Sequence, residues 1–229
     1  NEAESILEKF ILDDPLCPFN YSNLAIIYFQ KEKFLECINF FERAIQLKPD
    51  FLDAINNLGL AYQRANLFKK SILTFEKALL IKSDFFEALN NLGYSYLLIK
   101  DFDHARSCFE KILSQDPKDI TALYRLAMTL ESIKLFDKAI DCYRKVLNLS
   151  PSNIYAINNL AHILNLKGDK LEALELFKRG FNLKPNFVPF LINLAILYQE
   201  MCLYDESYEY ILKVIKIQPD HPKIYFILG

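Results

Sequence analysis

Apolar residues along the chain recur at the spacing of helices that bury one face. In residues 86–119, two segments each place apolar and small residues three or four positions apart, as in an α-helix with one buried side. These residues are Leu92, Gly93 and Tyr96 in the first segment, and Ala105, Phe109 and Ile112 in the second. Pro117 follows, and proline cannot continue a helix because it has no backbone N–H. The pattern predicts a helix, a turn, a second helix and a stop.

The same pattern returns with a 34-residue period in both directions, which predicts a repeat array. The first-helix leucine is Leu24, Leu58, Leu92, Leu126, Leu160, Leu194 and Leu228. The small residues that follow it are Ala25, Gly59, Gly93, Ala127, Ala161, Ala195 and Gly229. The second-helix row is Phe41, Phe75, Phe109, Tyr143, Phe177 and Ile211. The closing prolines are Pro15, Pro49, Pro117, Pro151, Pro185 and Pro219, with Ser83 in place of the missing one.

Each recurring residue type has a physical reason. We expect the small residue to let paired helices approach, and the aromatic residues to fill the space between one pair and the next. Each pair then leaves a face that only its neighbour can cover. Residues 154–187 are predicted to be the most loosely packed repeat, because Lys170 replaces an aromatic residue and Gly180 replaces alanine.

This repeat resembles the tetratricopeptide repeat (TPR) family, with its Leu-Gly, Tyr, Ala-x3-Phe and Pro pattern. The resemblance implies an all-α solenoid of helical hairpins wound into a right-handed superhelix, with first helices lining a concave groove. We expect one elongated domain. Its predicted parts are residues 1–17 (the second helix of a partial repeat), complete repeats at 18–51, 52–85, 86–119, 120–153, 154–187 and 188–221, and residues 222–229 (the start of a truncated repeat).

Neither end carries the polar capping helix that repeat arrays commonly have. We therefore expect the chain to be part of a longer protein that continues at both ends. The incomplete repeats at 1–17 and 222–229 could also complete each other between molecules, which would give head-to-tail self-association.

Composition argues against several classes of partner. The net charge is −2, and basic residues are interleaved with acidic ones, so neither nucleic acid nor an anionic membrane is expected to bind. Apolar segments are too short to span a bilayer. Five cysteines without a CxxC spacing favour free thiols over disulfides or metal ligands, and hence a soluble protein of the reducing cytoplasm.

The sequence contains no pattern typical of catalysis. It lacks a Gly-rich phosphate loop, HExxH and GxSxG, and its three histidines, His104, His162 and His221, hold different repeat positions. We therefore expect no enzymatic activity, cofactor or metal site in this chain.

A polar row precedes the first-helix leucine. It consists of Asn23, Asn57, Asn91, Arg125, Asn159 and Asn193. A carboxamide can pair with a peptide N–H and C=O together, so a line of amides could hold an extended peptide. The row resembles the asparagine ladder in the TPR superhelix of O-GlcNAc transferases, which contacts substrate backbones. The alternative is that these amides bond only to a neighbouring helix or to water.

Aromatic and apolar residues are predicted beside this polar row. The predicted peptide-binding tyrosines are Tyr94, Tyr124 and Tyr155, and the other predicted lining residues are Ile26, Phe29, Leu60, Leu97, Met128, Ile192 and Ile196. Some of these residues could instead belong to the core. The chaperone-binding TPR class uses a carboxylate clamp, but Asn56, Leu60 and Thr121 stand where lysine, asparagine and lysine are needed.

The sequence thus predicts a non-catalytic scaffold that binds a protein or peptide segment along its groove. Two alternatives stay open. The chain could be the substrate-recognition arm of a larger enzyme such as an O-linked glycosyltransferase, or a structural element that self-assembles.

Overall fold

The computed structural model describes residues 2–220 and 222, and in this part of the chain every regular element is an α-helix. The first helices of the hairpins are α2 (Pro18–Gln30), α4 (Leu52–Arg64), α6 (Phe86–Leu98), α8 (Ile120–Ser132), α10 (Ile154–Lys167) and α12 (Val188–Glu200). The second helices are α3 (Phe34–Leu47), α5 (Phe68–Ile81), α7 (Phe102–Gln115), α9 (Phe136–Leu149), α11 (Lys170–Leu183) and α13 (Tyr204–Ile217), and α1 (Glu2–Asp13) precedes them. The predicted all-α hairpin fold is confirmed.

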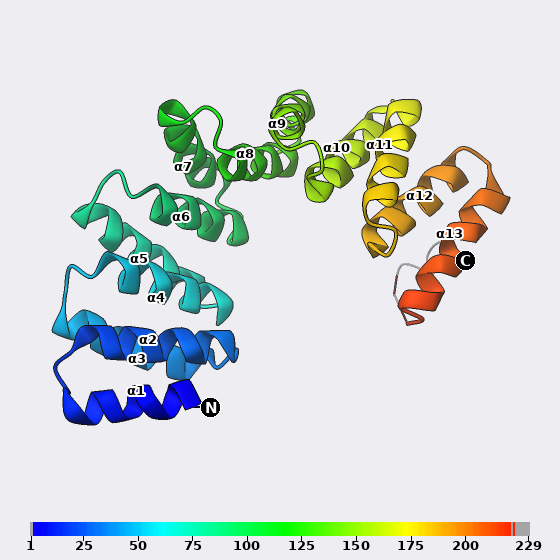
Figure 1. The fold of residues 1–229 in the computed structure, drawn as a ribbon. Helices are drawn as coiled ribbons and strands as arrows, with labels where there is room; N and C mark the ends of the chain where they lie inside the picture. Colours follow the sequence, from blue (N-terminus) through cyan, green and yellow to red (C-terminus); the bar gives the residue numbers. More distant parts are fainter. Residues whose placement is uncertain (1, 221, 223–229) are drawn as a thin grey trace. The chain divides into compact units, whose positions relative to one another are not determined.

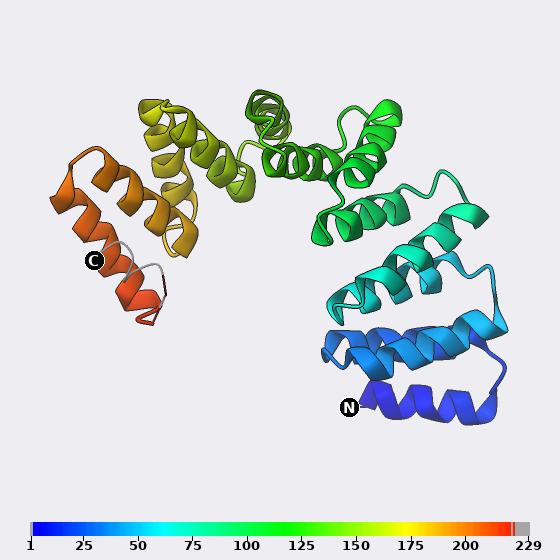
Figure 2. The same ribbon diagram turned by 180° about the vertical axis from the view of Figure 1, so that it is seen from behind.

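The chain divides into two compact units, residues 1–117 and 118–229. In the first unit, α1 packs on α2, each later helix packs on the one before it, and α4 also contacts α2 and α6 (Figure 1). In the second unit, α8 to α13 pack in the same sequential way, and α10 contacts α12 (Figure 2). First helices therefore lie side by side within each unit. The single elongated domain and its boundaries stay predictions, and residues 223–229 of the last segment lie outside the described residues.

A left-handed residue links the two helices of each hairpin. Positive φ values recur at the same position of every hairpin, at Glu32, Asn66, Lys100, Lys134, Gly168 and Cys202. In the first hairpin the N–H of Glu32 donates to the carbonyl of Phe29, and the N–H of Lys33 donates to that of Tyr28. This is the Schellman arrangement, which satisfies carbonyl groups at a helix end. Only Asn66 and Gly168 are residue types that favour this conformation.

Second helices end in an extended residue. Lys48 precedes Pro49 and has φ −137° and ψ 91°, as expected before a proline. Lys82 precedes Ser83 and has nearly the same geometry, φ −139° and ψ 100°. The hairpin junction therefore keeps its shape without the proline.

The second-helix aromatic row forms the centre of each hairpin. Phe41, Phe75, Phe109, Tyr143 and Phe177 are all at most 1% exposed. A Cβ atom built on Gly59 would lie 2.4 Å from Cε1 of Phe75, so the ring occupies the space that a larger residue would need. The small residue therefore accommodates the aromatic ring of its own hairpin.

Gly180 does not loosen its repeat in the way the sequence suggests. Gly180 is buried, and its added Cβ would lie 2.2 Å from Cζ of Phe190, a side chain with no exposed surface. In other repeats the two equivalent positions hold Ala44 with Ala54, Ala78 with Ala88, Ile112 with Ala122 and Val146 with Ala156. The glycine therefore makes room for a larger partner, and the prediction of loose packing is wrong at this position.

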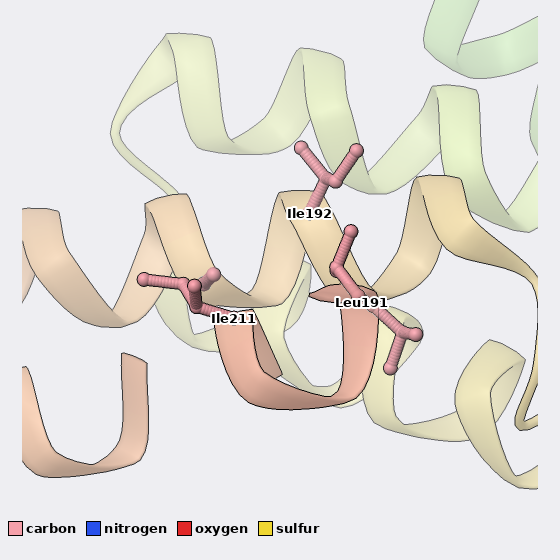
Figure 3. Close-up of a cluster of buried hydrophobic side chains, with 5 residues drawn as sticks. Leu191, Ile192 and Ile211 are labelled. Carbon is pink, nitrogen blue, oxygen red and sulfur yellow. The ribbon is translucent and has the colours of Figure 1, made fainter. Parts of the chain in front are cut away.

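The last hairpin contains a cluster of buried aliphatic residues. Leu191, Ile192 and Ala195 of α12 form a buried cluster with Ile211 and Val214 of α13. Figure 3 shows Leu191, Ile192 and Ile211 in this cluster. Ile192 is 4% exposed and was a predicted groove residue, so for this side chain the alternative assignment to the core is confirmed.

Candidate functional site

The polar row lies on the first helices, one residue on each, but its members differ in burial. Asn23 on α2 is exposed, Asn57 on α4 is half-buried and Asn91 on α6 is buried. In the second unit, Arg125 on α8, Asn159 on α10 and Asn193 on α12 are all half-buried. The five amides of the row are therefore not equivalent.

In the second unit, the asparagine amides bond to neighbouring helices. Asn159 donates one N–H to Tyr124 Oη at 3.2 Å and the other to Tyr143 Oη at 3.1 Å. Asn193 donates to Asn158 Oδ1 at 2.8 Å, and Asn158 donates to Asn159 Oδ1 at 3.3 Å. A primary amide has two N–H donors, so both donors of Asn159 are already used.

In the first unit, Asn91 is held in the same way. Its amide donates to Asn56 Oδ1 at 3.2 Å, and Asn56 donates to Glu87 Oε1 at 3.0 Å. The partner lies 35 positions earlier, as it does for Tyr124 and Asn159 and for Asn158 and Asn193. A polar side chain one position before a member of the row therefore accepts a hydrogen bond from the row asparagine of the next repeat. The sequence contains this signal, but the polar row taken alone does not reveal it.

Asn57 has a different environment. The residue 35 positions before it is Ser22, which is 4% exposed, and among the described residues no hydrogen bond engages the Asn57 side chain. Its amide lies instead at a cavity of about 440 Å³, which we call the first-helix cavity. The cavity is lined by Ile26, Phe29, Gln30, Phe41, Asn57 and Leu60. The structure thus brings together four residues that the sequence predicted to share a groove: Ile26, Phe29, Asn57 and Leu60.

The three predicted tyrosines lie in different surroundings. Tyr94 is half-buried. Tyr124 packs against Tyr143 with ring centroids 5.8 Å apart and accepts the hydrogen bond from Asn159. Tyr155 is 55% exposed, and its ring meets that of Phe187 edge-on at 5.7 Å. Within the second unit, Tyr124 is therefore engaged by hydrogen bonding and ring packing, whereas Tyr155 keeps an exposed face.

Asn193 lines a cavity in the second unit. This cavity has a volume of about 430 Å³, and Asn158 and Ile192 also line it. The Asn193 amide already donates to Asn158 there, so it is engaged within the protein.

Tyrosine–glutamate hydrogen bonds join successive repeats. Tyr62 donates to Glu42 at 2.5 Å, and Tyr96, its equivalent in the next repeat, donates to Glu76 at 2.9 Å. Burial, followed by the hydrogen bond to Glu76, raises the pKa of Tyr96 to about 12. These phenols therefore stay protonated at neutral pH and act as donors.

Glu131 is a part-buried carboxylate at the end of α8 that the repeat pattern does not single out. It accepts a hydrogen bond from Tyr143 at 2.8 Å, next to the Asn159 network. Burial raises the pKa of the Glu131 carboxyl group, although the hydrogen bond from Tyr143 opposes this shift. The charge is therefore held at a cost to stability.

Residues 2–220 and 222 contain neither a cluster of metal-ligand side chains nor a membrane-spanning helix. No group of three or more His, Cys, Asp or Glu side chains in this range could hold a metal ion. No helix within the same range is long and apolar enough to cross a membrane. The five cysteines are free thiols.

Family models decide the classification. Models described as tetratricopeptide repeat match residues 20–51, 86–119 and 120–153, and a second set matches residues 52–85, 154–187 and 188–221. The chain belongs to the tetratricopeptide repeat family. A sequence comparison with curated proteins gives no match.

Solved TPR structures share the fold. PilW, a widely conserved type IV pilus biogenesis factor, aligns with a TM-score of 0.85 and 20% identity over 93% of this chain and 98% of its own. PilF of Pseudomonas aeruginosa aligns with a TM-score of 0.79 and 17% identity over 93% and 96%. YrrB, a TPR protein with an unusual peptide-binding site, aligns with a TM-score of 0.62 and 19% identity over 81% and 95%. A protein-interaction scaffold is the general function that membership of the TPR family supports.

Proposed function

We propose that this TPR protein is a non-catalytic scaffold that binds an extended peptide segment of a partner protein at the first-helix cavity. The observation that carries the proposal is the Asn57 amide. It lies at an apolar cavity without a hydrogen bond to any described residue, while Asn91, Asn159 and Asn193 are bonded to neighbouring helices.

The chemistry of the cavity suits a peptide with an apolar side chain. Ile26, Phe29 and Leu60 offer apolar walls, and Phe41 lies at the cavity with 1% of its surface exposed. The Asn57 amide can donate to a peptide carbonyl and accept from a peptide N–H. Gln30 adds a second carboxamide at the same cavity.

Several contacts must act together in this site. A hydrogen bond contributes about 1 kcal/mol net, whereas ordering a flexible segment costs about 2–5 kcal/mol. Burial of an apolar side chain supplies about 1.5–3 kcal/mol. A ligand therefore needs an apolar anchor together with several hydrogen bonds, because one such contact alone does not offset the cost of ordering the segment.

The bonded asparagines bear on the role of the other repeats. A peptide that used the Asn159 amide would have to displace the hydrogen bonds to Tyr124 and Tyr143. We therefore assign peptide holding to Asn57, with exposed Asn23 beside it in the row, and a helix-joining role to Asn91, Asn159 and Asn193. Tyr94, Tyr124, Tyr155 and Arg125 stay candidates for contacts with a longer ligand.

The cytoplasm is the compartment that we propose, because all five cysteines are free thiols and three of them are buried. Burial raises the pKa of the Cys37 thiol to about 12 and that of Cys108 to about 11, so both stay protonated and unreactive at neutral pH.

Panning a phage library of random peptides against the full chain, followed by titration of the selected peptides, tests the proposal. We expect Asn57→Ala to weaken binding about threefold to tenfold, the equivalent of one hydrogen bond. We expect Leu60→Glu to weaken it more, because the variant places a charge in the apolar cavity.

Two variants serve as matched controls. Asn159→Ala removes an amide from the same repeat position and should lower thermal stability but leave peptide affinity unchanged. Leu80→Glu places the same charge on α5 at a side chain that is 88% exposed, and should change neither property. If Asn57→Ala and Leu60→Glu bind the peptide as tightly as the parent does, the peptide does not bind at the first-helix cavity.

A further inference from the structure

A second cavity lies on another side of α4. It has a volume of about 420 Å³ and lies between α3 and α5, and we call it the second-helix cavity. Its apolar lining includes Ile45, Ile55 and Leu58, which are at most 9% exposed. At about 100° per residue, Ile55 and Leu58 point away from Asn57 and Leu60. The two cavities therefore open on different faces of the first unit.

In two other repeats, a cationic side chain crosses the equivalent space. Lys111 of α7 donates to the carbonyl of Ser83 at 3.4 Å, and Arg179 of α11 donates to the carbonyl of Pro151. The equivalent pair at the second-helix cavity is Lys77 and Pro49. Among the described residues, Lys77 makes no hydrogen bond or ion pair. Lys77 and Pro49 both line the open cavity instead.

The last hairpin shows another way in which the space is filled. Phe181 stands at the position of Ile45, and Lys213 stands at that of Lys77. The Lys213 ammonium group lies 5.3 Å from the centre of the Phe181 ring, and the cavity there is only about 190 Å³. At the second-helix cavity the corresponding residues are the aliphatic Ile45 and Lys77, which makes no hydrogen bond or ion pair with a described residue.

The charged groups around the cavity favour an acidic ligand. Lys70, Thr74 and Lys77 are spaced to share one face of α5, and the Lys70 ammonium group lies 5.5 Å from the centre of the Tyr62 ring at the cavity. The one carboxylate in the lining is Glu42, and the Tyr62 hydroxyl already donates to it at 2.5 Å. The lining therefore holds the ammonium group of Lys77, with that of Lys70 nearby over the Tyr62 ring, and one carboxylate that is already hydrogen-bonded within the protein.

We propose that the second-helix cavity is a separate docking site for a partner segment that carries an aliphatic side chain beside acidic residues. The aliphatic side chain enters against Ile45 and Leu58, and Ile55 lies at the cavity without exposed surface. The acidic residues pair with Lys77 and Lys70, which lie on the α5 side of the opening. The site is independent of peptide binding at Asn57, so one TPR unit can hold two segments together.

Methyl NMR on the full chain tests this proposal with two defined probes, acetyl-Glu-Leu-Leu-Glu-amide and acetyl-Lys-Leu-Leu-Lys-amide. We expect the acidic peptide to shift the methyl signals of Ile45, Ile55 and Leu58, and the basic peptide to leave them in place. Lys77→Glu should weaken the acidic peptide about tenfold or more by reversing the charge at the rim. Added salt should weaken it as well, because these charges are exposed.

Two further variants keep the test decisive. Ile45→Phe copies the residue found at position 181, and should abolish the shifts of the Ile55 and Leu58 methyl groups while the protein stays folded. Asn57→Ala should leave the acidic peptide bound as in the parent. Methyl signals that do not move, equal shifts with the basic peptide, or unchanged binding by both Ile45→Phe and Lys77→Glu would overturn the proposal.

Discussion

At the scale of single residues, two positions ten residues apart pack against each other, and a small residue at one leaves room for a large residue at the other. Ala44 is matched with Ala54 and Ala78 with Ala88, Ile112 and Val146 are matched with alanine, and Gly180 is matched with Phe190. The Phe190 ring lies where a Cβ of residue 180 would be, at 2.2 Å. The absence of a side chain at one position therefore fits the large ring at the other.

This pairing predicts that the effect of Gly180→Ala on stability depends on residue 190. The substitution should destabilise the parent and stabilise the Phe190→Ala variant. In the parent, overpacking against Phe190 costs about 1–3 kcal/mol and outweighs the gain of about 1 kcal/mol in helix propensity. Phe190→Ala alone should cost about 3–5 kcal/mol. In the Phe190→Ala background, Gly180→Ala should stabilise the protein by about 1 kcal/mol, because the clash is gone. Denaturant unfolding of the four proteins measures this cycle, and stabilisation by Gly180→Ala in the parent would refute the pairing.

Glu131 leads to a prediction about pH. Burial raises the pKa of its carboxyl group above the ordinary value of 4.5, so the folded protein holds this proton more tightly than the unfolded chain does. Its contribution to stability is therefore fully present below the unfolded pKa and is lost as the pH rises through the folded pKa. Glu131→Gln keeps an acceptor for the Tyr143 hydroxyl and removes the charge.

We expect Glu131→Gln to raise the free energy of unfolding at pH 7 and to have little effect at pH values below the ordinary pKa of 4.5. Urea unfolding across this range gives the comparison, with Glu175→Gln, a change at an exposed glutamate of α11, as the control. A stability loss at pH 7 would show that the ionised carboxylate is the favoured partner of Tyr143.

At the scale of elements, the hairpin turn keeps its geometry from repeat to repeat but not its residue type. Six equivalent positions of the repeat have positive φ, and four of them hold Glu, Lys, Lys and Cys. An L-residue other than glycine or asparagine in this region costs about 1–2 kcal/mol. The helices on either side must therefore enforce the turn through their packing.

Replacing Lys134 by glycine should stabilise the protein by about 1 kcal/mol, and Gly168→Ala should destabilise it by a similar amount. No atom lies within 4 Å of the added Cβ at Gly168, so the backbone conformation alone sets that cost. Glu209→Gly in the exposed interior of α13 is the control, and should cost about 0.5–1 kcal/mol. Thermal unfolding gives the order of stability of the variants. A Lys134→Gly protein that melts below the parent would contradict this account of the turn.

The helices and their pairing could be predicted because the repeat period appears directly in rows such as those of Leu58 and Phe75. The left-handed turn residues could not, because Lys100 and Lys134 carry no sequence mark for positive φ. The state of the amides could not be predicted from the polar row alone either. Whether Asn91 or Asn57 bonds within the protein depends on the residue 35 positions earlier, which is Asn56 in one case and Ser22 in the other.

At the scale of the molecule, the TPR repeats share one helical arrangement, but equivalent positions make different contacts. Each unit is held by contacts between successive helices, with Asn91 and Asn159 joining first helices across repeats. Asn57 occupies an equivalent position but lies at an apolar cavity. A ligand should therefore bind at repeats where the polar side chain of the row makes no hydrogen bond within the protein, and not evenly along the row.

The most direct measurement is side-chain amide NMR on the full chain as a phage-selected peptide is added. We expect the Asn57 amide signals to shift with the bound fraction, while the Asn159 amide signals keep their positions because both donors stay bonded to tyrosine hydroxyls. A peptide that binds tightly while the Asn57 amide signals stay unchanged would contradict the account.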